Sequence, residues 1–260
     1  MTNEQIAQIL DNAAHEAKAV QQMAANENFS LEDAYTIQQI SINRRLERGE
    51  KITGFKLGFT SKAKMEQMNV HDLIWGFLTD EMEIQANEKV DLARWIHPRA
   101  EPEIAFRVSQ DFPDRELGLE ELPEYLDKMA VAIEIIDSRY ENFKFSLEDV
   151  VADNCSSTGY VIGDWQDLEQ ETCLAGRQVS DLDIELKIND EVIQKGKTSA
   201  ILGNPLQPVI ELSRLASDAN IAVKEGYVIL AGAATAAEYL KPKQEIEAEV
   251  ENLGDVRFKT

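Results

Sequence analysis

Two glutamates lie two positions apart in the otherwise apolar segment PRAEPEIAF, residues 98–106. Because side chains alternate between the faces of a strand, Glu101 and Glu103 share one face, about 7 Å apart along it. A third acid, Glu134, is flanked by isoleucines in VAIEIIDSRY. Carboxylates in apolar surroundings repel one another and have raised pKa values unless a cation neutralises them. The pattern is therefore compatible with a site for a hard divalent ion such as Mg²⁺ or Mn²⁺, or with ion pairs to nearby arginines.

The segments that must position these acids are predicted to be strands that follow a helical region. Apolar residues recur at helical spacing through residues 3–50, where Ser30 and Asp33 form a capping box. From Gly54 onward most segments are strand-like, and Asn189-Asp190 is typical of a hairpin turn.

Short helices are predicted at residues 146–154 and, opened by Pro205, at 204–220, while 223–240 is predicted to be a strand. The elements do not alternate as βαβα, so an α+β fold is expected. Its N-terminal helical cap would span residues 1–50. A mixed β-roll or barrel-like body would span residues 51–260 as one structural unit.

Composition narrows the possible partners. The chain has 260 residues with 48 Asp plus Glu against 26 Lys plus Arg, a net charge of −22, which disfavours nucleic acid. No apolar run reaches the roughly 18 residues that a membrane span needs, and the polar N-terminus does not resemble a secretory signal, so a cytoplasmic location is expected. Two cysteines, Cys155 and Cys173, and three scattered histidines, His15, His71 and His97, predict neither a zinc site nor a histidine-based triad.

Two glycine-containing segments are not nucleotide sites. GKTS, residues 196–199, lacks the glycine that a phosphate-binding loop needs five positions earlier, because position 191 is Glu191. AGAATAA, residues 231–237, lacks the Gly-x-Gly-x-x-Gly spacing of a dinucleotide site. Its small residues instead indicate tight packing or close approach of the backbone to a ligand.

Four motifs, in order along the chain, resemble the 2-keto-4-pentenoate hydratase and 4-oxalocrotonate decarboxylase family of the fumarylacetoacetase-like superfamily. They are GFKLGFTSKAKMEQM, HPRAEPEIAF, AIEIIDSRYENFKF and VVADNCSSTGYVIG. The similarity extends from about residue 30 to the C-terminus. It implies the fumarylacetoacetase-type β-roll, a homo-oligomer and a divalent metal, Mg²⁺ or Mn²⁺, held by Glu101, Glu103 and Glu134.

The resemblance also implies the other site residues. Lys56, in the Gly-x-Lys-x-Gly segment, is the expected acid/base residue, whose pKa burial would lower. Asp80 is a candidate for holding Lys56 or a water. Gly58, Phe59, Thr60, Ser156 and Thr235 are expected to line the carboxylate end of the substrate, and Arg139 is expected to be structural, paired with Asp137 or a neighbouring acid. Asn204 replaces a histidine common in the family, so an acid/base role for that position is doubtful here.

The implied substrates are small 2-oxo acids from aromatic ring cleavage. In this family a bound metal polarises the 2-oxo group and stabilises the enolate. The segments DSRYENFKF and LAGAATAA favour the decarboxylase branch, which converts 2-oxohex-3-enedioate to 2-hydroxypenta-2,4-dienoate. A hydratase acting on 2-hydroxypenta-2,4-dienoate is the alternative. A second alternative is a non-catalytic partner of such an enzyme, since decarboxylases of this family associate with a sister hydratase.

Overall fold

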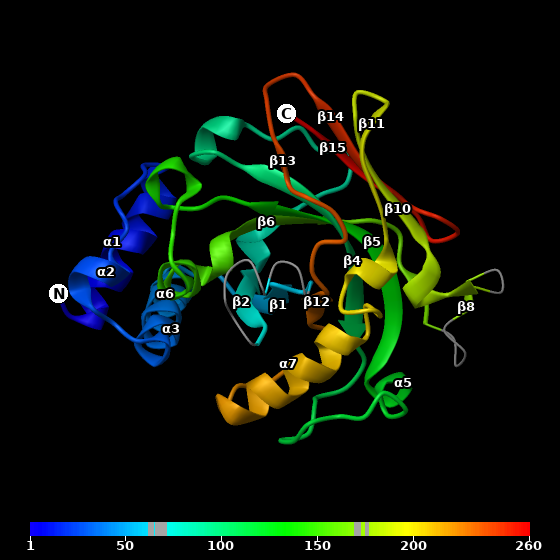
Figure 1. The fold of residues 1–260 in the computed structure, drawn as a ribbon, viewed down its shortest axis with the longest axis horizontal. Helices are drawn as coiled ribbons and strands as arrows, with labels where there is room; N and C mark the ends of the chain where they lie inside the picture. Colours follow the sequence, from blue (N-terminus) through cyan, green and yellow to red (C-terminus); the bar gives the residue numbers. More distant parts are fainter. Residues whose placement is uncertain (62–64, 66–71, 169–172, 175–176) are drawn as a thin grey trace.

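The structure is a computed structural model that describes residues 1–61, 65, 72–168, 173–174 and 177–260. His71 and the side chain of Cys173 lie outside the described part. The described helices gather mainly at one side of the molecule, beside a large curled sheet (Figure 1). They are α1 (Asn3–Glu16), α2 (Ala24–Glu27), α3 (Leu31–Glu47), α5 (Leu122–Tyr125), α6 (Leu147–Ala152) and α7 (Gln207–Asp218). None of them combines the length and apolarity needed to cross a bilayer.

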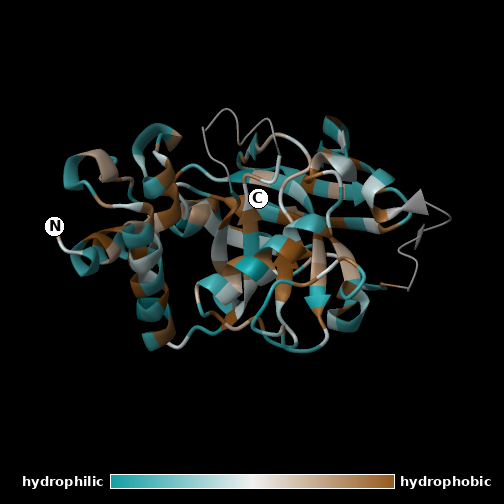
Figure 2. Cartoon of the chain, turned by 60° about the horizontal axis from the view of Figure 1, so that its bottom comes forward, coloured by the Kyte–Doolittle hydropathy of each residue, from teal (hydrophilic) through white to brown (hydrophobic). Residues whose placement is uncertain are grey.

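Helices α1 and α3 begin at capping boxes. Thr2 and Gln5 form a capping box at the start of α1, and Ser30 and Asp33 form the predicted one at the start of α3. The cap helices carry both hydrophilic and hydrophobic residues (Figure 2). Their apolar side chains form a separate core cluster that includes Ile6, Leu10, Ile37 and side chains of α6. We call residues 1–50 the helical cap.

The body is built on a nine-stranded mixed sheet. Its main path runs in the order β2 (Ile74–Thr79), β1 (Ile52–Gly58), β12 (Val228–Leu230), β4 (Arg99–Val108), β5 (Leu126–Ile136), β6 (Ser157–Ile162) and β3 (Glu83–Ile84). Two short strands lie off this path, β13 (Glu238–Tyr239) beside β4 and β7 (Gln166–Asp167) beside β5. The predicted α+β class and curled, barrel-like sheet are confirmed.

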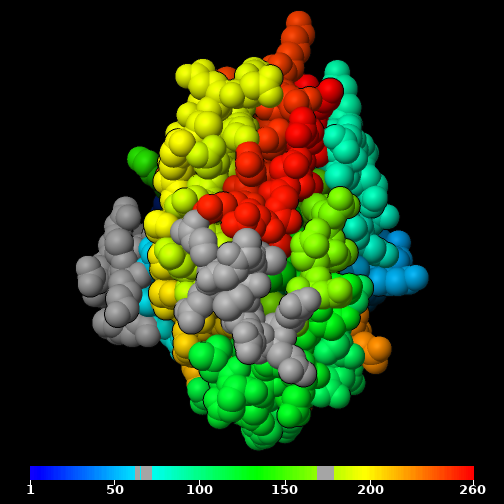
Figure 3. All heavy atoms as spheres, turned by 90° about the vertical axis from the view of Figure 1, so that its right-hand side faces the viewer, coloured from blue at the N-terminus to red at the C-terminus, as the bar shows by residue number. Residues whose placement is uncertain are grey.

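A second, four-stranded sheet packs against β4 and β5. Its order is β11 (Glu191–Lys197), β10 (Asp183–Ile188), β14 (Glu245–Val250) and β15 (Gly254–Lys259). In Figure 3 the yellow β10 and β11 and the red β14 and β15 lie together on one face. Asn189 and Asp190 both have positive φ, 52° and 65°, which confirms the predicted hairpin turn. A third sheet pairs only β8 (Cys173–Leu174) with β9 (Arg177–Gln178).

Two predicted elements differ from the structure. Helix α7 begins at Gln207, with Pro208 in its first turn, rather than at Pro205. The strand predicted over residues 223–240 is two short strands, β12 and β13, separated by the loop 231–237. The small residues of that loop let the backbone turn beside β4 instead of continuing the ladder.

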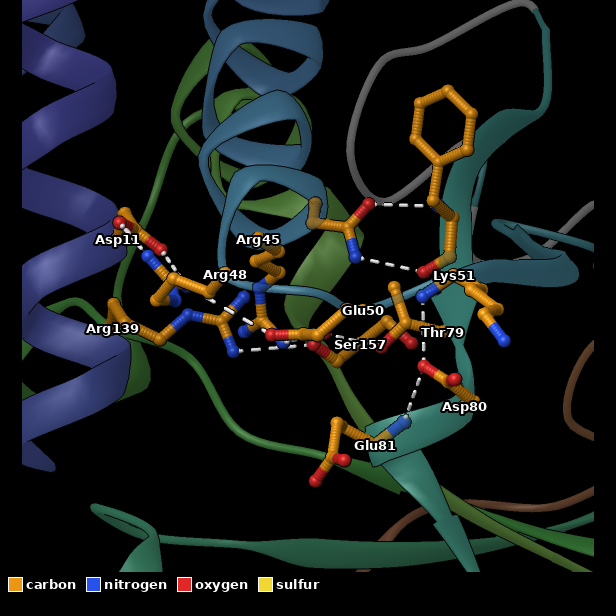
Figure 4. A network of polar contacts seen from close by, with 12 residues as sticks. Asp11, Arg45, Arg48, Glu50, Lys51, Thr79, Asp80, Glu81, Arg139 and Ser157 are labelled. Atoms are coloured by element: carbon orange, nitrogen blue, oxygen red, sulfur yellow. Dashed lines mark hydrogen bonds and ion pairs between the residues drawn. The ribbon is translucent and has the colours of Figure 1, made fainter.

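Charged residues join the helical cap to the body (Figure 4). Arg45 of α3 lies 3.4 Å from Oε2 of Glu50, which also accepts a hydrogen bond from the Thr79 hydroxyl at 2.7 Å. Asp11 of α1 accepts hydrogen bonds from Arg48, the residue after α3, at 2.7 and 2.8 Å. These contacts hold α1 and α3 against each other and α3 against the end of β2.

Candidate metal centre and active site

Strand register gathers the three predicted acids. Strands β4 and β5 pair antiparallel, and Glu101 stands directly opposite Glu134, with Glu103 two positions further along the same face. One carboxylate oxygen from each residue lies within 4.8 Å of the others, and all three side chains are buried. Like charges directly opposite in a sheet are destabilising, so this pairing calls for a positive partner.

The oxygens of the cluster have spare acceptor capacity. Oε1 of Glu103 and both oxygens of Glu134 are buried without a hydrogen-bond partner among the described residues. The remaining Glu103 oxygen, Oε2, accepts the backbone N–H of Gly232 at 2.8 Å. Leaving a buried charged acceptor unpaired costs about 1–3 kcal/mol or more. Such an all-carboxylate set fits a hard divalent cation, which takes oxygen ligands.

The electrostatics agree with this geometry. Burial raises the pKa of Glu103 well above its usual range, and the neighbouring Glu134 and Glu101 raise it further. Burial also raises the pKa of Glu134, although Lys56 acts in the opposite direction. The protein therefore tolerates this much negative charge in one place only with protons or a cation on the cluster.

Lys56 of β1 is the cationic neighbour of the cluster. Its Nζ forms an ion pair with Oε2 of Glu134 at 3.1 Å and donates a hydrogen bond to the carbonyl of Cys155 at 3.0 Å. Burial alone would lower the pKa of Lys56, but the nearby negative groups, Glu134 above all, outweigh it and raise the pKa. The expectation of a lowered pKa is therefore wrong for this arrangement, in which the ammonium counters the carboxylates.

The carbonyl that receives Lys56 belongs to a strained turn. Asn154, Cys155 and Ser156 all have positive φ, between 50° and 59°, a conformation that costs side-chain-bearing residues about 1–3 kcal/mol each. The Asn154 side chain holds the turn by exchanging two hydrogen bonds with the backbone of Phe77, at 2.8 and 2.9 Å. This left-handed conformation of the turn points the Cys155 carbonyl towards Lys56.

A cavity of about 590 Å³ opens beside Lys56 and Glu101. Gly58, Phe59 and Ser156, which were predicted to line the carboxylate end of the substrate, lie on its wall. Thr60 and Thr235 are not among the residues that line it. Thr60 is buried beneath Gly232, and the Thr235 hydroxyl donates to the carbonyl of Ala236. The backbone loop, through Ala236 and Ala237, lines the cavity in place of Thr235.

Asp80 does not hold Lys56. It is exposed at the end of β2 and accepts hydrogen bonds from the backbone N–H groups of Lys51, at 2.8 Å, and Glu81, at 3.1 Å (Figure 4). The Lys56 ammonium lies instead against Glu134 and Cys155. Asp80 caps a backbone turn. The sequence around a short acid does not show whether it caps a turn or takes part in catalysis.

Arg139 and Asn204 have structural surroundings. The buried Arg139 pairs with Asp153, and its guanidinium also donates to the carbonyl of Ser157, at 3.3 Å. Asp137, the other expected partner, instead accepts the backbone N–H groups of Ile96 and His97 at 2.8 Å. Asn204 accepts the N–H of Leu206 at 3.0 Å just before α7, away from the residues that line the cavity.

Two contributors to the site were missed from the sequence because they act through the backbone. They are the Cys155 carbonyl and the Gly232 N–H. Gly232 has φ 104°, and a Cβ there would lie 2.1 Å from the Thr60 hydroxyl oxygen. The small-residue segment 231–237 was the available signal, since it indicated close backbone approach or tight packing.

Comparisons with known proteins agree with this fold. The chain matches the family model described as fumarylacetoacetate (FAA) hydrolase C-terminal over residues 57–259. It is 43% identical over 255 residues to a 4-oxalocrotonate decarboxylase of a Pseudomonas species, covering 98% of this chain and 96% of the relative. A 2-keto-4-pentenoate hydratase of Paraburkholderia xenovorans is 30% identical over 230 residues, covering 88% and 84%. The chain belongs to the fumarylacetoacetate hydrolase C-terminal family.

Within that family, the likeness to decarboxylases extends to a solved structure. The 4-oxalocrotonate decarboxylase of Pseudomonas putida G7, complexed with magnesium and adipate, matches with a TM-score of 0.91 at 34% identity. The match covers 99% of this chain and 96% of that one. The named relatives are decarboxylases and hydratases, so the predicted family and the prediction of an enzyme are confirmed.

Proposed function

We propose that this chain is a metal-dependent decarboxylase that converts 2-oxohex-3-enedioate to 2-hydroxypenta-2,4-dienoate and CO₂. The observation that carries the proposal is the buried cluster of Glu101, Glu103 and Glu134 beside Lys56. The 43% identity to a 4-oxalocrotonate decarboxylase supports this branch of the family. A related decarboxylase has been solved with magnesium and adipate, a six-carbon diacid, which supports both the metal and the substrate class.

The reaction breaks the C5–C6 bond of the substrate. The bonding pair forms C4=C5, the C3=C4 pair moves to C2=C3, and the 2-oxo oxygen takes the negative charge and then a proton. A divalent ion held by the three glutamates supplies a Lewis acid for this electron flow. The ammonium of Lys56 holds a proton, and we assign it to proton transfer or to pairing with a substrate carboxylate. The apolar side chains of Phe59, Phe145 and Val150 line the cavity and suit the release of neutral CO₂.

A side-by-side assay tests the proposal. The protein is given 2-oxohex-3-enedioate and 2-hydroxypenta-2,4-dienoate separately, with Mg²⁺ and with a chelator. CO₂ release from the first, dependent on Mg²⁺, with no consumption of the second, is the expected result. Water addition to the second without CO₂ from the first would make the protein a hydratase, the alternative that the 30% identical hydratase relatives support. A protein that binds no metal and transforms neither compound would be a non-catalytic partner.

Glu103→Gln is the matching substitution. It keeps the side-chain volume but removes the charge of a fully buried ligand candidate, so kcat/KM should fall by about 10²–10³ or more. Calorimetric titration with Mg²⁺ should show weakened binding while circular dichroism stays unchanged. Glu249→Gln, at an exposed position on β14, is the control and should keep full activity. Full turnover of Glu103→Gln at saturating Mg²⁺ would refute the metal role.

The proposal extends to the state of the protein in the cell. We expect a cytoplasmic homo-oligomer, which associates with a sister hydratase where one is present. Light scattering of the purified chain, alone and mixed with a 2-keto-4-pentenoate hydratase, measures both properties. A monomer at micromolar concentration would contradict the first expectation.

A further inference from the structure

Arg99 lies on the same face of β4 as the metal-site glutamates. It is the first residue of the strand, two positions before Glu101, so it sits about 7 Å further along that face. Arg99 and Glu101 both line the cavity that opens beside Lys56. The cavity therefore has a carboxylate end at the glutamates and a guanidinium one step away along the same strand.

Two aromatic rings hold the Arg99 guanidinium. Its central carbon lies 3.8 Å from the ring centroid of Phe143 and 4.1 Å from that of Tyr239. Tyr239 is the residue paired with Arg99 across β13 and β4, and its hydroxyl accepts a hydrogen bond from Nη2. Phe143 has φ 56°, an uncommon conformation for a bulky side chain, and Asn142 before it has φ 59°. A strained segment thus places one of the two rings.

None of the described acids neutralises the charge of Arg99. Among the described residues it makes no ion pair, and its Nε is buried without a hydrogen-bond partner. Arg107, eight residues further along the same strand, differs from Arg99 because it forms an ion pair with Asp127. Lys144 adds a second cation to the same cavity wall, and it too has no ion pair within the described part of the chain. A guanidinium donates its N–H groups in its own plane, a geometry that suits a carboxylate.

We propose that Arg99 is the specificity residue that binds the far carboxylate of a linear dicarboxylic 2-oxo acid. The inference rests on the proposed function, which sets the 2-oxo acid end of the substrate at the three glutamates. Arg99 and Glu101 line the same cavity from one face of β4, so one linear substrate can reach both. Phe143 and Tyr239 hold the guanidinium in place, since its central carbon lies over both rings and Nη2 donates to the Tyr239 hydroxyl.

The chemistry of the reaction sets which kinetic constant responds. The far carboxylate loses its charge as CO₂ forms, so an ion pair to it stabilises the bound substrate more than the transition state. Arg99→Leu should therefore raise KM for 2-oxohex-3-enedioate at least tenfold and change kcat by less than threefold. A merely structural residue would lower kcat together with metal affinity.

Binding of unreactive analogues to the Mg²⁺-loaded protein gives the sharper test. By calorimetry, wild-type protein should bind 2-oxoadipate at least tenfold more tightly than 2-oxohexanoate, which has the same chain and 2-oxo acid end but no second carboxylate. Arg99→Leu should lose this preference and bind 2-oxohexanoate as wild type does. Arg99→Lys should keep part of the preference. Arg107→Leu, on the same strand but paired with Asp127, is the control and should keep all of it.

Three results would overturn the inference. The first is an unchanged preference for 2-oxoadipate in Arg99→Leu. The second is an equal loss of affinity for both ligands in folded Arg99→Lys. The third is a wild-type protein that binds both ligands equally well. The last result together with CO₂ release would leave the decarboxylase assignment intact. A lost preference in Arg99→Leu in a protein that releases no CO₂ would instead keep the diacid site and reject the decarboxylase.

Discussion

At the scale of single residues, the site places like charges directly opposite each other. Glu101 faces Glu134 across two strands, and both are buried, an arrangement that is unfavourable unless positive charge is close. Lys56 supplies one positive charge, and it contacts Glu134 alone of the three acids at ion-pair distance. Within the described part of the chain, three buried carboxylates gather beside the ammonium of Lys56, an arrangement that favours a divalent cation there.

Lys56→Ala separates proton transfer from metal binding. Turnover should fall by about 10²–10⁴, as is typical for loss of a general acid or base. Mg²⁺ affinity should be unchanged or higher, because a positive charge beside Glu134 has been removed. Steady-state kinetics and calorimetric Mg²⁺ titration measure the two effects, with exposed Lys195→Ala as the control. An unchanged kcat would remove Lys56 from the mechanism.

At the scale of elements, function depends on how strands and turns are joined. The left-handed turn 154–156 follows α6 and precedes β6, and the Asn154 side chain ties it to β2. The cap helices in turn are fastened by ion pairs, of which the buried Asp11 is the centre. Burial alone would raise the pKa of Asp11, but hydrogen bonds from Arg48 and Arg44 outweigh it and lower the pKa.

The lowered pKa of Asp11 predicts a pH-dependent contribution to stability. Because the folded protein favours the charged form, the contribution is complete above the unfolded value of about 3.9 and is lost as the pH falls through the lower folded value. Asp11→Asn should lower the free energy of unfolding by about 1–2 kcal/mol at pH 7, since Arg48 is partly exposed. Urea denaturation at pH 7 and at pH 3.5 should show the difference shrinking at the lower pH. The same loss at both values would contradict the assignment, and exposed Asp190→Asn should cost little at either.

At the scale of the whole molecule, charge works against compactness. A net charge of −22 on 260 residues means that the folded protein repels itself. Raising NaCl from about 10 to 150 mM shortens the screening length from about 30 to 8 Å, so the melting temperature should rise by a few degrees. Differential scanning calorimetry at both salt concentrations measures it. A fall would mean that surface ion pairs outweigh the repulsion.

Local signals in the sequence were enough for the fold class and for the acids. The capping box at Ser30, the turn at Asn189 and the spacing of Glu101 and Glu103 each act within a few residues, where sequence patterns are informative. Pairings between distant segments were not visible. The parallel pairing of β1 with β12 joins Gly54 to Val228. Backbone groups such as the Cys155 carbonyl complete the site, and because every residue has them, no residue type reveals them.

Asp80 shows how a local sequence signal can give a wrong prediction. A short acid near a strand end has the same sequence signature whether it serves catalysis or caps a turn, and only its neighbours in space decide between them. The sequence likewise did not show that Thr60 and Thr235 are not among the residues that line the cavity. Thr60 lies beneath Gly232, a contact between segments far apart in the chain, and the Thr235 hydroxyl donates to the carbonyl of its neighbour Ala236.

Gly232 limits how this enzyme can be engineered. A library that diversifies the cavity to accept other acids will return inactive clones at position 232, since any side chain there would strike Thr60 and displace the N–H that orients Glu103. Thr60→Ser would not relieve the clash, because the hydroxyl oxygen is itself the closest atom. New substrate range has to come from residues that line the cavity away from Gly232, such as 143–145. There the chain already accepts unusual backbone geometry, and changes leave the glutamates undisturbed.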